Sequence, residues 1–273
     1  MSAALKSPSA IKKRRNRGEL HVVVTQKHRR AIQKLVAWGK QNARTFPWRS
    51  RRTAFRVLIA EKLLQQTAAR NVLTEAYRRL VAYCPTPSQL ARADVQRLQH
   101  IVEPLGFIYR AKELKRLGKV LTSEHNGRVP ADLRSLLNLP GIGDYTARAV
   151  LSFAFGARIP VVDTNIARFL HRFFGLASPI PANPARSTAL SKLAAEIMPP
   201  GKSSAFNFAL LDLCAAVCTP SAPKCEICPL KNTCFTGRLR LSTKRNQLQR
   251  NRIERLRGEL NAARSRRNRR LHS

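Results

Sequence analysis

The sequence is short of acidic residues, of aromatic residues and of long apolar runs. Only 15 of its 273 residues are Asp or Glu, against 51 Lys and Arg, and aromatic residues make up 6%. No apolar run reaches the 18 residues of a membrane-spanning helix, so we expect no such helix. The basic N-terminus is not followed by an apolar stretch, so we also expect no signal peptide and no secretion.

The surplus of basic residues indicates a polyanionic partner. A formal net charge of +36 at pH 7 repels itself and disfavours a compact chain, unless a polyanion lies close by. A membrane surface is the alternative to nucleic acid, but the missing apolar segment argues against it. Hydrophobic residues still form 44% of the chain, which is enough for a packed core. We therefore expect a folded nucleic-acid-binding protein.

The apolar residues are spaced as in helices. No segment alternates apolar and polar residues with the period of two that a half-buried strand requires. Leu114, Leu117 and Leu121 recur instead at helical intervals. The apolar stretch 159–162 contains Pro160, which argues against a strand there. We therefore predict an all-α protein.

The segment Leu139-Pro140-Gly141-Ile142-Gly143 has the composition of a tight hairpin between two helices. We expect one helix to end near Leu137 and the next to begin near Asp144. Two glycines two residues apart let the backbone turn sharply and approach another group closely. The unpaired N–H groups at the start of the second helix suit a phosphate. Taken alone, the segment is equally compatible with an ordinary helix–turn–helix connection.

Four of the six cysteines have the spacing of metal ligands. Four thiolates in a compact loop can hold either a [4Fe–4S] cluster or a structural zinc ion, and spacing alone does not choose between them. Cys214 and Cys84 lie outside this pattern, and we expect them to be small buried hydrophobes. The pattern is Cys218-x6-Cys225-x2-Cys228-x5-Cys234.

The hairpin segment and the cysteine spacing, together and in this order, resemble the helix-hairpin-helix DNA glycosylases of the endonuclease III and MutY family. The resemblance covers roughly residues 28–237. It implies a [4Fe–4S] cluster on the four cysteines and two helical domains that hold DNA between them. The predicted division is a flexible basic arm at 1–27, a cluster domain at 28–46 plus 158–237, a six-helix barrel with the hairpin at 47–157, and a flexible basic tail at 238–273, with a helix on bound DNA as the alternative for the tail.

The same resemblance supplies two catalytic carboxyl groups. Asp163 matches the aspartate that stabilises positive charge on the sugar while the N-glycosidic bond breaks. Read in isolation, Asp163 is a helix N-cap. Glu61 matches the MutY glutamate that protonates the departing base, and its apolar surroundings would raise its pKa. The alternative for Glu61 is a surface carboxylate at the edge of a helix.

The resemblance also separates two reaction types. Tyr145 is the third candidate catalytic residue, because it stands where members that cut the strand carry a lysine. A tyrosine cannot form the Schiff base that cutting requires. We therefore predict hydrolytic base removal without strong lyase activity; lyase chemistry would have to come from Lys62. The expected DNA contacts are Arg49, Leu139, Gly141 and Gly143, with Gln66 and Phe107 as candidate wedges, although Phe107 is equally compatible with core packing.

The identity of the removed base stays open between two branches. The turn Phe46-Pro47-Trp48-Arg49 is similar in MutY and in the thymine–guanine mismatch glycosylases. Tyr145 resembles the second branch, whereas Gln65-Gln66 resembles MutY. MutY enzymes also carry a C-terminal domain that reads 8-oxoguanine, and here a short basic segment follows the cysteines. We favour thymine or uracil opposite guanine, with adenine opposite guanine or 8-oxoguanine as the alternative.

The expected setting is base excision repair of mismatched double-stranded DNA by a monomer. We expect the protein in the cytoplasm or nucleoid if its source is a bacterium, and in the nucleus if it is a eukaryote. A non-catalytic DNA-binding protein is the remoter alternative. The carboxyl groups at both matched catalytic positions argue against it, because a pure binder gains nothing from negative charge near phosphates.

Overall fold

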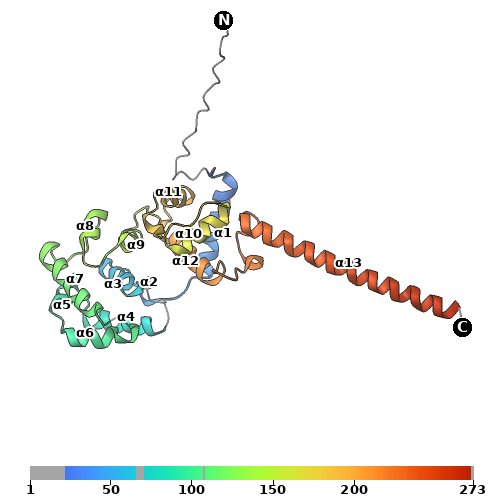
Figure 1. Cartoon of the computed structure of the whole chain (residues 1–273). Helices are drawn as coiled ribbons and strands as arrows, with labels where there is room; N and C mark the ends of the chain where they lie inside the picture. Colours follow the sequence, from blue (N-terminus) through green and yellow to red (C-terminus); the bar gives the residue numbers. More distant parts are fainter. Residues whose placement is uncertain (1–21, 66–70, 107, 272–273) are drawn as a thin grey trace, which may run out of the picture.

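The computed structural model describes residues 22–65, 71–106 and 108–271 (Figure 1). Within these ranges the chain forms helices and no strands, which confirms the predicted all-α class. None of the described helices is long and apolar enough to cross a membrane. Most of the predicted arm at 1–27 and both candidate wedges, Gln66 and Phe107, lie outside the described residues.

Thirteen α-helices occur in the described chain, joined by short loops and three 3-10 turns. The helix α10, for example, is capped by Asp163 at its start and ends at Gly175, whose left-handed φ of 72° suits glycine. Their bounds are α1 Gln26–Gln41, α2 Pro47–Ser50, α3 Ala54–Leu64, α4 Asn71–Tyr83, α5 Pro87–Arg92, α6 Val95–Val102, α7 Arg110–Glu124, α8 Leu133–Asn138, α9 Asp144–Ala154, α10 Thr164–Phe174, α11 Thr188–Ile197, α12 Ser203–Ala216 and α13 Phe235–Leu271.

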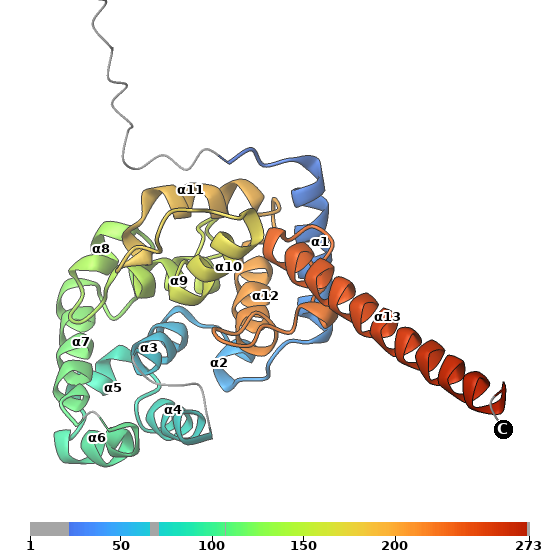
Figure 2. The ribbon, with the colours of Figure 1, turned by 45° about the vertical axis from the view of Figure 1, so that its right-hand side comes forward.

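The C-terminal segment differs from its prediction. The expected flexible tail at 238–273 is a continuous helix through Leu271, and Figures 1 and 2 show it projecting from the body. Residues 238–273 contain no Pro and a single Gly, and they are rich in Arg and Leu, which favour helices. The charge of this segment led to the prediction of a flexible tail, while its helix propensity decides its local structure.

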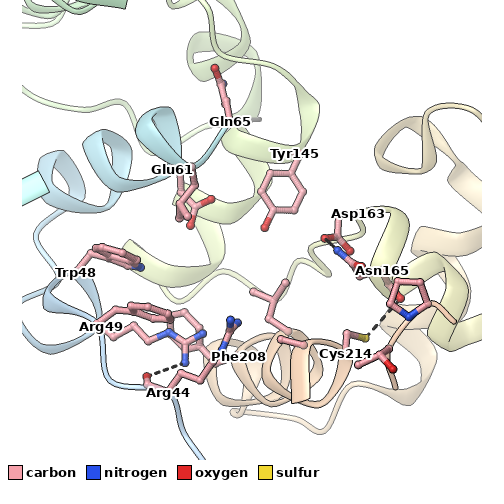
Figure 3. Close-up of a pocket in the computed structure, with 16 residues that line it drawn as sticks. Arg44, Trp48, Arg49, Glu61, Gln65, Tyr145, Asp163, Asn165, Phe208 and Cys214 are labelled. Carbon is pink, nitrogen blue, oxygen red and sulfur yellow. Dashed lines mark hydrogen bonds between the residues drawn. The ribbon is translucent and has the colours of Figure 1, made fainter. Parts of the chain in front are cut away.

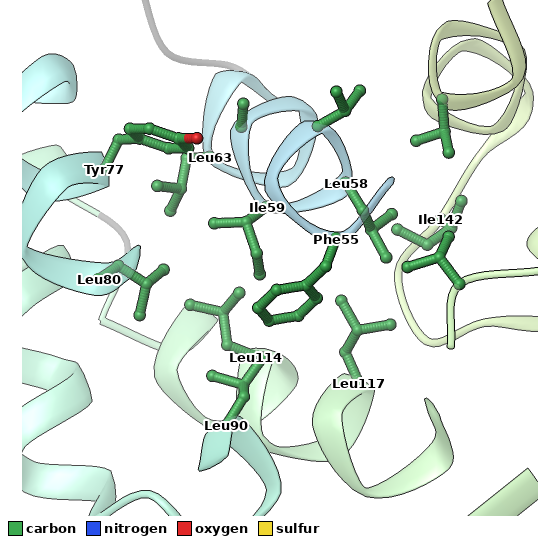
Figure 4. Close-up of a cluster of buried hydrophobic side chains, with 14 of the residues drawn as sticks. Phe55, Leu58, Ile59, Leu63, Tyr77, Leu80, Leu90, Leu114, Leu117 and Ile142 are labelled. Atoms are coloured by element: carbon green, nitrogen blue, oxygen red, sulfur yellow. The ribbon is translucent and has the colours of Figure 1, made fainter. Parts of the chain in front are cut away.

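The buried apolar side chains form two clusters. The first lies among α3, α4, α5, α7 and α9, with Phe55 near its centre (Figure 4). The second joins α1 to α10, α11 and α12. Val161 belongs to the first cluster and Val162 to the second, so the chain passes between them directly before Asp163. The chain crosses from one cluster to the other a few residues after the domain boundary expected at 157/158, and the domain division itself stays a prediction.

A buried amide ties the two clusters together. Asn207 on α12 is fully buried, and its Oδ1 accepts the backbone N–H of Val161 at 3.2 Å. Its Nδ2 donates to the carbonyl oxygen of Ile159 at 2.9 Å and to Oγ of Ser152 at 2.8 Å. The strand-like segment before Asp163 therefore receives from one side chain the hydrogen bonds that a neighbouring strand would otherwise supply.

We expect Asn207→Ala to lower the free energy of unfolding by about 2 kcal/mol, because it leaves buried backbone groups without partners. Urea denaturation measures this change. Asn251→Ala is the control, since Asn251 lies exposed on α13 and pairs only with Gln247 among the described residues. The control should change stability by less than about 0.5 kcal/mol. Equal unfolding free energies for the two variants would contradict the proposed tie.

Candidate active site

A pocket of about 530 Å³ lies where the two clusters meet, between α3 and α9 on one side and α10 and α12 on the other (Figure 3). It brings together the three residues expected to be catalytic, which lie far apart in the sequence. Glu61 comes from α3, Tyr145 from the first turn of α9, and Asp163 from the N-cap of α10. The sequence therefore predicted a set of side chains that the fold places around one cavity.

Glu61 is a buried carboxyl group. It is 6% exposed, and its Oε2 has no hydrogen-bond partner in the described part of the chain. Burial raises the pKa of Glu61 to about 7; the charge of Arg49 opposes this rise and that of Asp163 adds to it. The alternative of a surface carboxylate is wrong. A carboxyl group with a pKa near neutrality can carry and release a proton at physiological pH.

Asp163 combines the two interpretations that the sequence allowed. Its Oδ1 accepts the backbone N–H of Ile166 at 2.7 Å, so it is the N-cap of α10. Its Oδ2 accepts Nδ2 of Asn165 at 2.9 Å, and the side chain lines the pocket. The positive end of the α10 dipole favours a negative charge at this position. The cap therefore fixes a carboxylate at the mouth of the pocket.

Tyr145 lies on the same pocket wall as Glu61, directly after the hairpin. Burial raises the pKa of its phenol well above the usual value, and the negative charges of Glu61 and Asp163 raise it further. The side chain is therefore a neutral hydroxyl group that can donate a hydrogen bond. It offers no amine to a sugar.

The floor of the pocket holds a buried ion pair that sequence reasoning missed. Asp212 on α12 is 1% exposed and accepts Nη1 of Arg49 at 2.7 Å and Nη2 at 3.0 Å. Arg44 donates its Nε to the same carboxylate at 2.6 Å. The guanidinium of Arg49 stacks over Phe208, 4.4 Å from the ring centroid. The one signal in the sequence was a lone Asp in the apolar run 208–217.

Arg49 therefore has a different setting from the one expected of a DNA contact. Its guanidinium lines the pocket and is held there by Asp212. The Nε atom of Arg49 is buried and has no hydrogen-bond partner among the described residues. Phe46 and Trp48 stack in parallel beside it, with ring centroids 4.7 Å apart. This wall therefore combines flat apolar rings with a buried N–H donor.

The hairpin has the geometry that the sequence predicts. Gly141 has a left-handed φ of 68°, and Gly143 is the exposed N-cap of α9. Asp144 in the first turn of α9 pairs with Arg186 at 2.9 Å. The side chain of Leu139 is buried, so this residue can reach DNA only through its backbone. The predicted phosphate contacts at the hairpin stay predictions.

Lys62 is hydrogen-bonded to this hairpin. Its ammonium pairs with Glu113 at 2.8 Å and donates to the carbonyl oxygen of Gly141 at 3.1 Å. Gln65 donates to the same carbonyl oxygen at 3.0 Å. Lys62 is 2% exposed and is not one of the described residues that line the pocket. It therefore braces α3 against the hairpin and is not placed to attack a sugar.

The four cysteines of the predicted ligand set line one cavity beside α10 and the start of α13. Burial raises the pKa of Cys228 to about 11, and the other three sulfurs raise it as well. The backbone N–H of Gly237 lies 3.4 Å from Sγ of Cys234, and Nη1 of Arg172 lies 3.6 Å from Sγ of Cys218. Apolar side chains complete the wall. These donors and this apolar surround fit a metal–sulfur cluster.

The four sulfurs do not form a closed site for one ion. Among the described residues, no group of three or more His, Cys, Asp and Glu side chains is placed to hold a metal ion. Cys214 and Cys84 are buried, as expected for cysteines outside the ligand set. The cluster itself stays a prediction.

Comparison with known proteins agrees with this geometry. The model of the family described as HhH-GPD superfamily base excision DNA repair protein matches residues 59–195. A thymine/uracil-DNA glycosylase of Pyrobaculum aerophilum is 36% identical over 202 residues, which cover 72% of this chain and 87% of that protein. An adenine DNA glycosylase of Mycolicibacterium smegmatis is 38% identical over 200 residues, covering 72% and 67%. The solved structure of a thermostable thymine-DNA glycosylase has a TM-score of 0.72 and 31% identity, covering 78% of this chain and 97% of that one.

The raised pKa of Glu61 predicts a pH-dependent stability. Below pH 4.5 the carboxyl group is protonated in the folded and the unfolded chain, and between 4.5 and about 7 only the folded chain keeps the proton. The folded protein therefore loses about 3 kcal/mol of stability as pH rises through this window. Glu61→Gln removes the titration, so the variant should gain that amount over the unmodified protein. Denaturant unfolding across the window measures it, and parallel curves would contradict the assignment.

Proposed function

Because the chain belongs to the HhH-GPD superfamily of base excision DNA repair proteins, we propose that it is a DNA glycosylase that hydrolyses the N-glycosidic bond of a mispaired base. The observation that carries this proposal is the single pocket that unites Glu61, Tyr145 and Asp163. Its volume of about 530 Å³ lies in the range of small-molecule sites, which suits a nucleotide extruded from the duplex.

Glu61 is the proposed proton donor to the departing base. Its pKa of about 7 leaves a large share of the carboxyl groups protonated at neutral pH. The Oε2 atom makes no hydrogen bond within the described chain, so no other group there competes with the base for its proton. Protonation turns the base into a better leaving group and weakens its bond to the sugar.

Asp163 is the proposed stabiliser of the sugar. Bond cleavage leaves positive charge on the sugar ring, and a fixed carboxylate lowers the energy of that charge without rearranging. The hydrogen bonds from Ile166 and Asn165 hold the carboxylate in place before the reaction. Water then attacks the sugar and returns a proton to the carboxylate of Glu61, so the products are a free base and an abasic site and the enzyme regains its starting state.

The proposed reaction stops at base removal. Strand cleavage through a Schiff base needs an amine at the sugar. Tyr145 provides a hydroxyl group, and the ammonium of Lys62 is engaged by Glu113 and by the carbonyl oxygen of Gly141. We therefore propose a monofunctional glycosylase that acts as a monomer on mismatched duplex DNA.

The proposed base is thymine or uracil opposite guanine. Tyr145, which lies in the pocket beside Glu61, stands at the position where this chain resembles the thymine–guanine mismatch branch. The thymine/uracil relative is also matched over 87% of its length. Adenine opposite guanine or 8-oxoguanine is the second candidate, because the adenine DNA glycosylase relative is 38% identical.

We also propose that a [4Fe–4S] cluster is held by Cys218, Cys225, Cys228 and Cys234. The apolar cavity that these side chains line and the N–H donors beside two of the sulfurs support this assignment. A bound cluster would cross-link the loop between α12 and α13 and so stabilise it. The hydrolytic steps are assigned to the pocket residues alone.

A panel of duplexes tests the proposed function. Single-turnover base release is measured on G·T, G·U, A·G and A·8-oxoG duplexes, with and without alkali to break abasic sites. We expect product from G·T and G·U, visible only after alkali. Product from the adenine pairs alone would support the second candidate. Strand breaks before alkali would contradict the hydrolytic mechanism, and no product on any duplex would contradict the glycosylase assignment for these bases.

Asp163→Asn tests the role of the carboxylate. We expect base release to fall by about 10³-fold, because the amide loses the charge that stabilises the sugar but keeps the helix cap. Binding to the same duplex should be unchanged in a gel-shift measurement. Asp132→Asn is the matched control, since Asp132 caps α8 through Ser135 and lies outside the pocket. Equal rates for the two variants would remove Asp163 from the mechanism.

A further inference from the structure

The helix α13 extends far beyond the body of the protein. It packs against α10 and the turn Cys225–Ile227 near its start. Every residue from 242 to 256 is exposed. Figures 1 and 2, which differ by a 45° rotation, both show the helix pointing away from the other helices. Its 37 residues span about 55 Å at 1.5 Å per residue.

The charge of α13 is almost entirely positive. Residues 235–271 contain 13 Lys and Arg and only two Glu. Arg240, Arg245, Arg250 and Arg255 recur every five residues, so each is rotated by about 140° from the one before. All four are exposed. Positive charge therefore surrounds the helix and is not confined to one face.

The apolar side chains of α13 do not form a docking face in its described part. The exposed ones are Phe235, Leu239, Leu248, Ile253 and Leu256. Leu239 and Leu248 are nine residues apart and lie on opposite sides of the helix. Leu239 and Ile253 lie within about 40° of each other around the axis, but the residues between them on that side, such as Asn246 and Arg250, are polar or charged. A membrane or a partner helix needs a continuous apolar stripe. A second copy of α13 would bring the same positive charge and be repelled.

A polyanion is the occupant that this surface fits. The neighbours Arg240 and Lys244, four residues apart, repel each other along the helix. Closely spaced phosphates would neutralise such pairs and stabilise the helix. Lys244 also pairs with Glu226 at 2.8 Å, which anchors the start of the helix beside the cysteine loop. The rest of the described helix extends beyond this anchor.

We propose that α13 binds the sugar–phosphate backbone of duplex DNA outside the segment that enters the base pocket. The choice of DNA as the polyanion rests on the proposed function. A helix of about 55 Å matches the length of roughly 16 base pairs at 3.4 Å each. Contacts to phosphates carry no base identity, so α13 adds affinity for any duplex sequence. It lengthens the DNA segment held by the enzyme without taking part in base removal.

The test compares two triple variants of the full chain on a fully paired duplex of about 40 base pairs. One is R245Q/R250Q/R252Q, which removes three exposed charges from α13 and keeps good helix formers. The matched control is K112Q/R116Q/K119Q, which removes three exposed charges from α7. Affinity is measured by fluorescence anisotropy over a range of salt concentrations. Far-UV circular dichroism checks that both variants keep their helix content.

For the α13 variant we expect the slope of log affinity against log salt to become shallower by about 2 to 3, close to one for each phosphate that the variant no longer neutralises. Affinity at low salt should fall by at least about tenfold. The slope of the control should change by less than about 1, the value for a single phosphate. A chain ending at Thr243 is the second variant, and its slope should be at least as shallow as that of the triple variant.

An unchanged slope for both α13 variants would overturn the proposal, as would an equal change in the α7 control. The duplex contains no mismatch, so this outcome does not depend on catalysis. A shallower slope together with no base release from any mismatched duplex would keep α13 as a DNA-binding arm while removing the glycosylase assignment. Base release together with unchanged slopes would keep the glycosylase assignment while removing α13 as a DNA-binding arm.

Discussion

The start of α10 is the constraint on which the site depends. Val161 and Val162 are buried in different apolar clusters, and the next residue, Asp163, caps α10. Two features therefore fix the position of the Asp163 carboxylate: the start of α10, and the buried segment in which the chain passes from the first apolar cluster to the second. The same helix holds the cysteine loop, because Arg168 donates to the carbonyl oxygen of Cys218 at 3.1 Å. One helix thus links the position of the pocket carboxylate to the cavity lined by the four cysteines.

The pocket also depends on a division of charge between two buried carboxyl groups, one on α3 and one on α12. Asp212 accepts both terminal nitrogens of Arg49, whereas Glu61 keeps an oxygen with no partner in the described chain. A guanidinium bonded to Glu61 would lower its pKa and abolish its use as an acid near neutral pH. By holding Arg49, Asp212 leaves the pKa of Glu61 at about 7. The burial that raises this pKa lowers the stability of the fold, and the proton transfer proposed for Glu61 depends on that raised pKa.

The features that the sequence predicted are local ones. The hairpin glycines, the cysteine spacing and the capping residue Asp163 each depend on residues a few positions apart, so a short motif reveals them. The settings of Asp212 and Lys62 were missed because their partners, Arg49 and the hairpin carbonyl of Gly141, lie 163 and 79 positions away. No periodicity encodes such a pairing. The flexible C-terminal tail was wrong for the opposite reason, since net charge describes solvation while helix propensity decides backbone conformation.

The pocket also limits where base identity can be read. The protonation proposed for Glu61 and the charge stabilisation proposed for Asp163 would serve a departing pyrimidine and a departing purine alike, so neither carboxyl group would discriminate between them. Discrimination must come from walls that touch the base edge and its faces. Trp48 and Phe208 offer apolar faces that accept any flat ring, whereas Arg49 offers a donor whose direction Asp212 fixes.

A donor that cannot turn penalises a base that places an amino group against it, because both groups then lose their hydrogen bonds. Because the turn that carries Arg49 is similar in both branches, base choice requires further contacts besides the Arg49–Asp212 pair. Branches that remove different bases can share the two carboxyl groups. The proposed chemistry of these groups acts on the sugar and on the leaving group, and not on the edge that distinguishes one base from another.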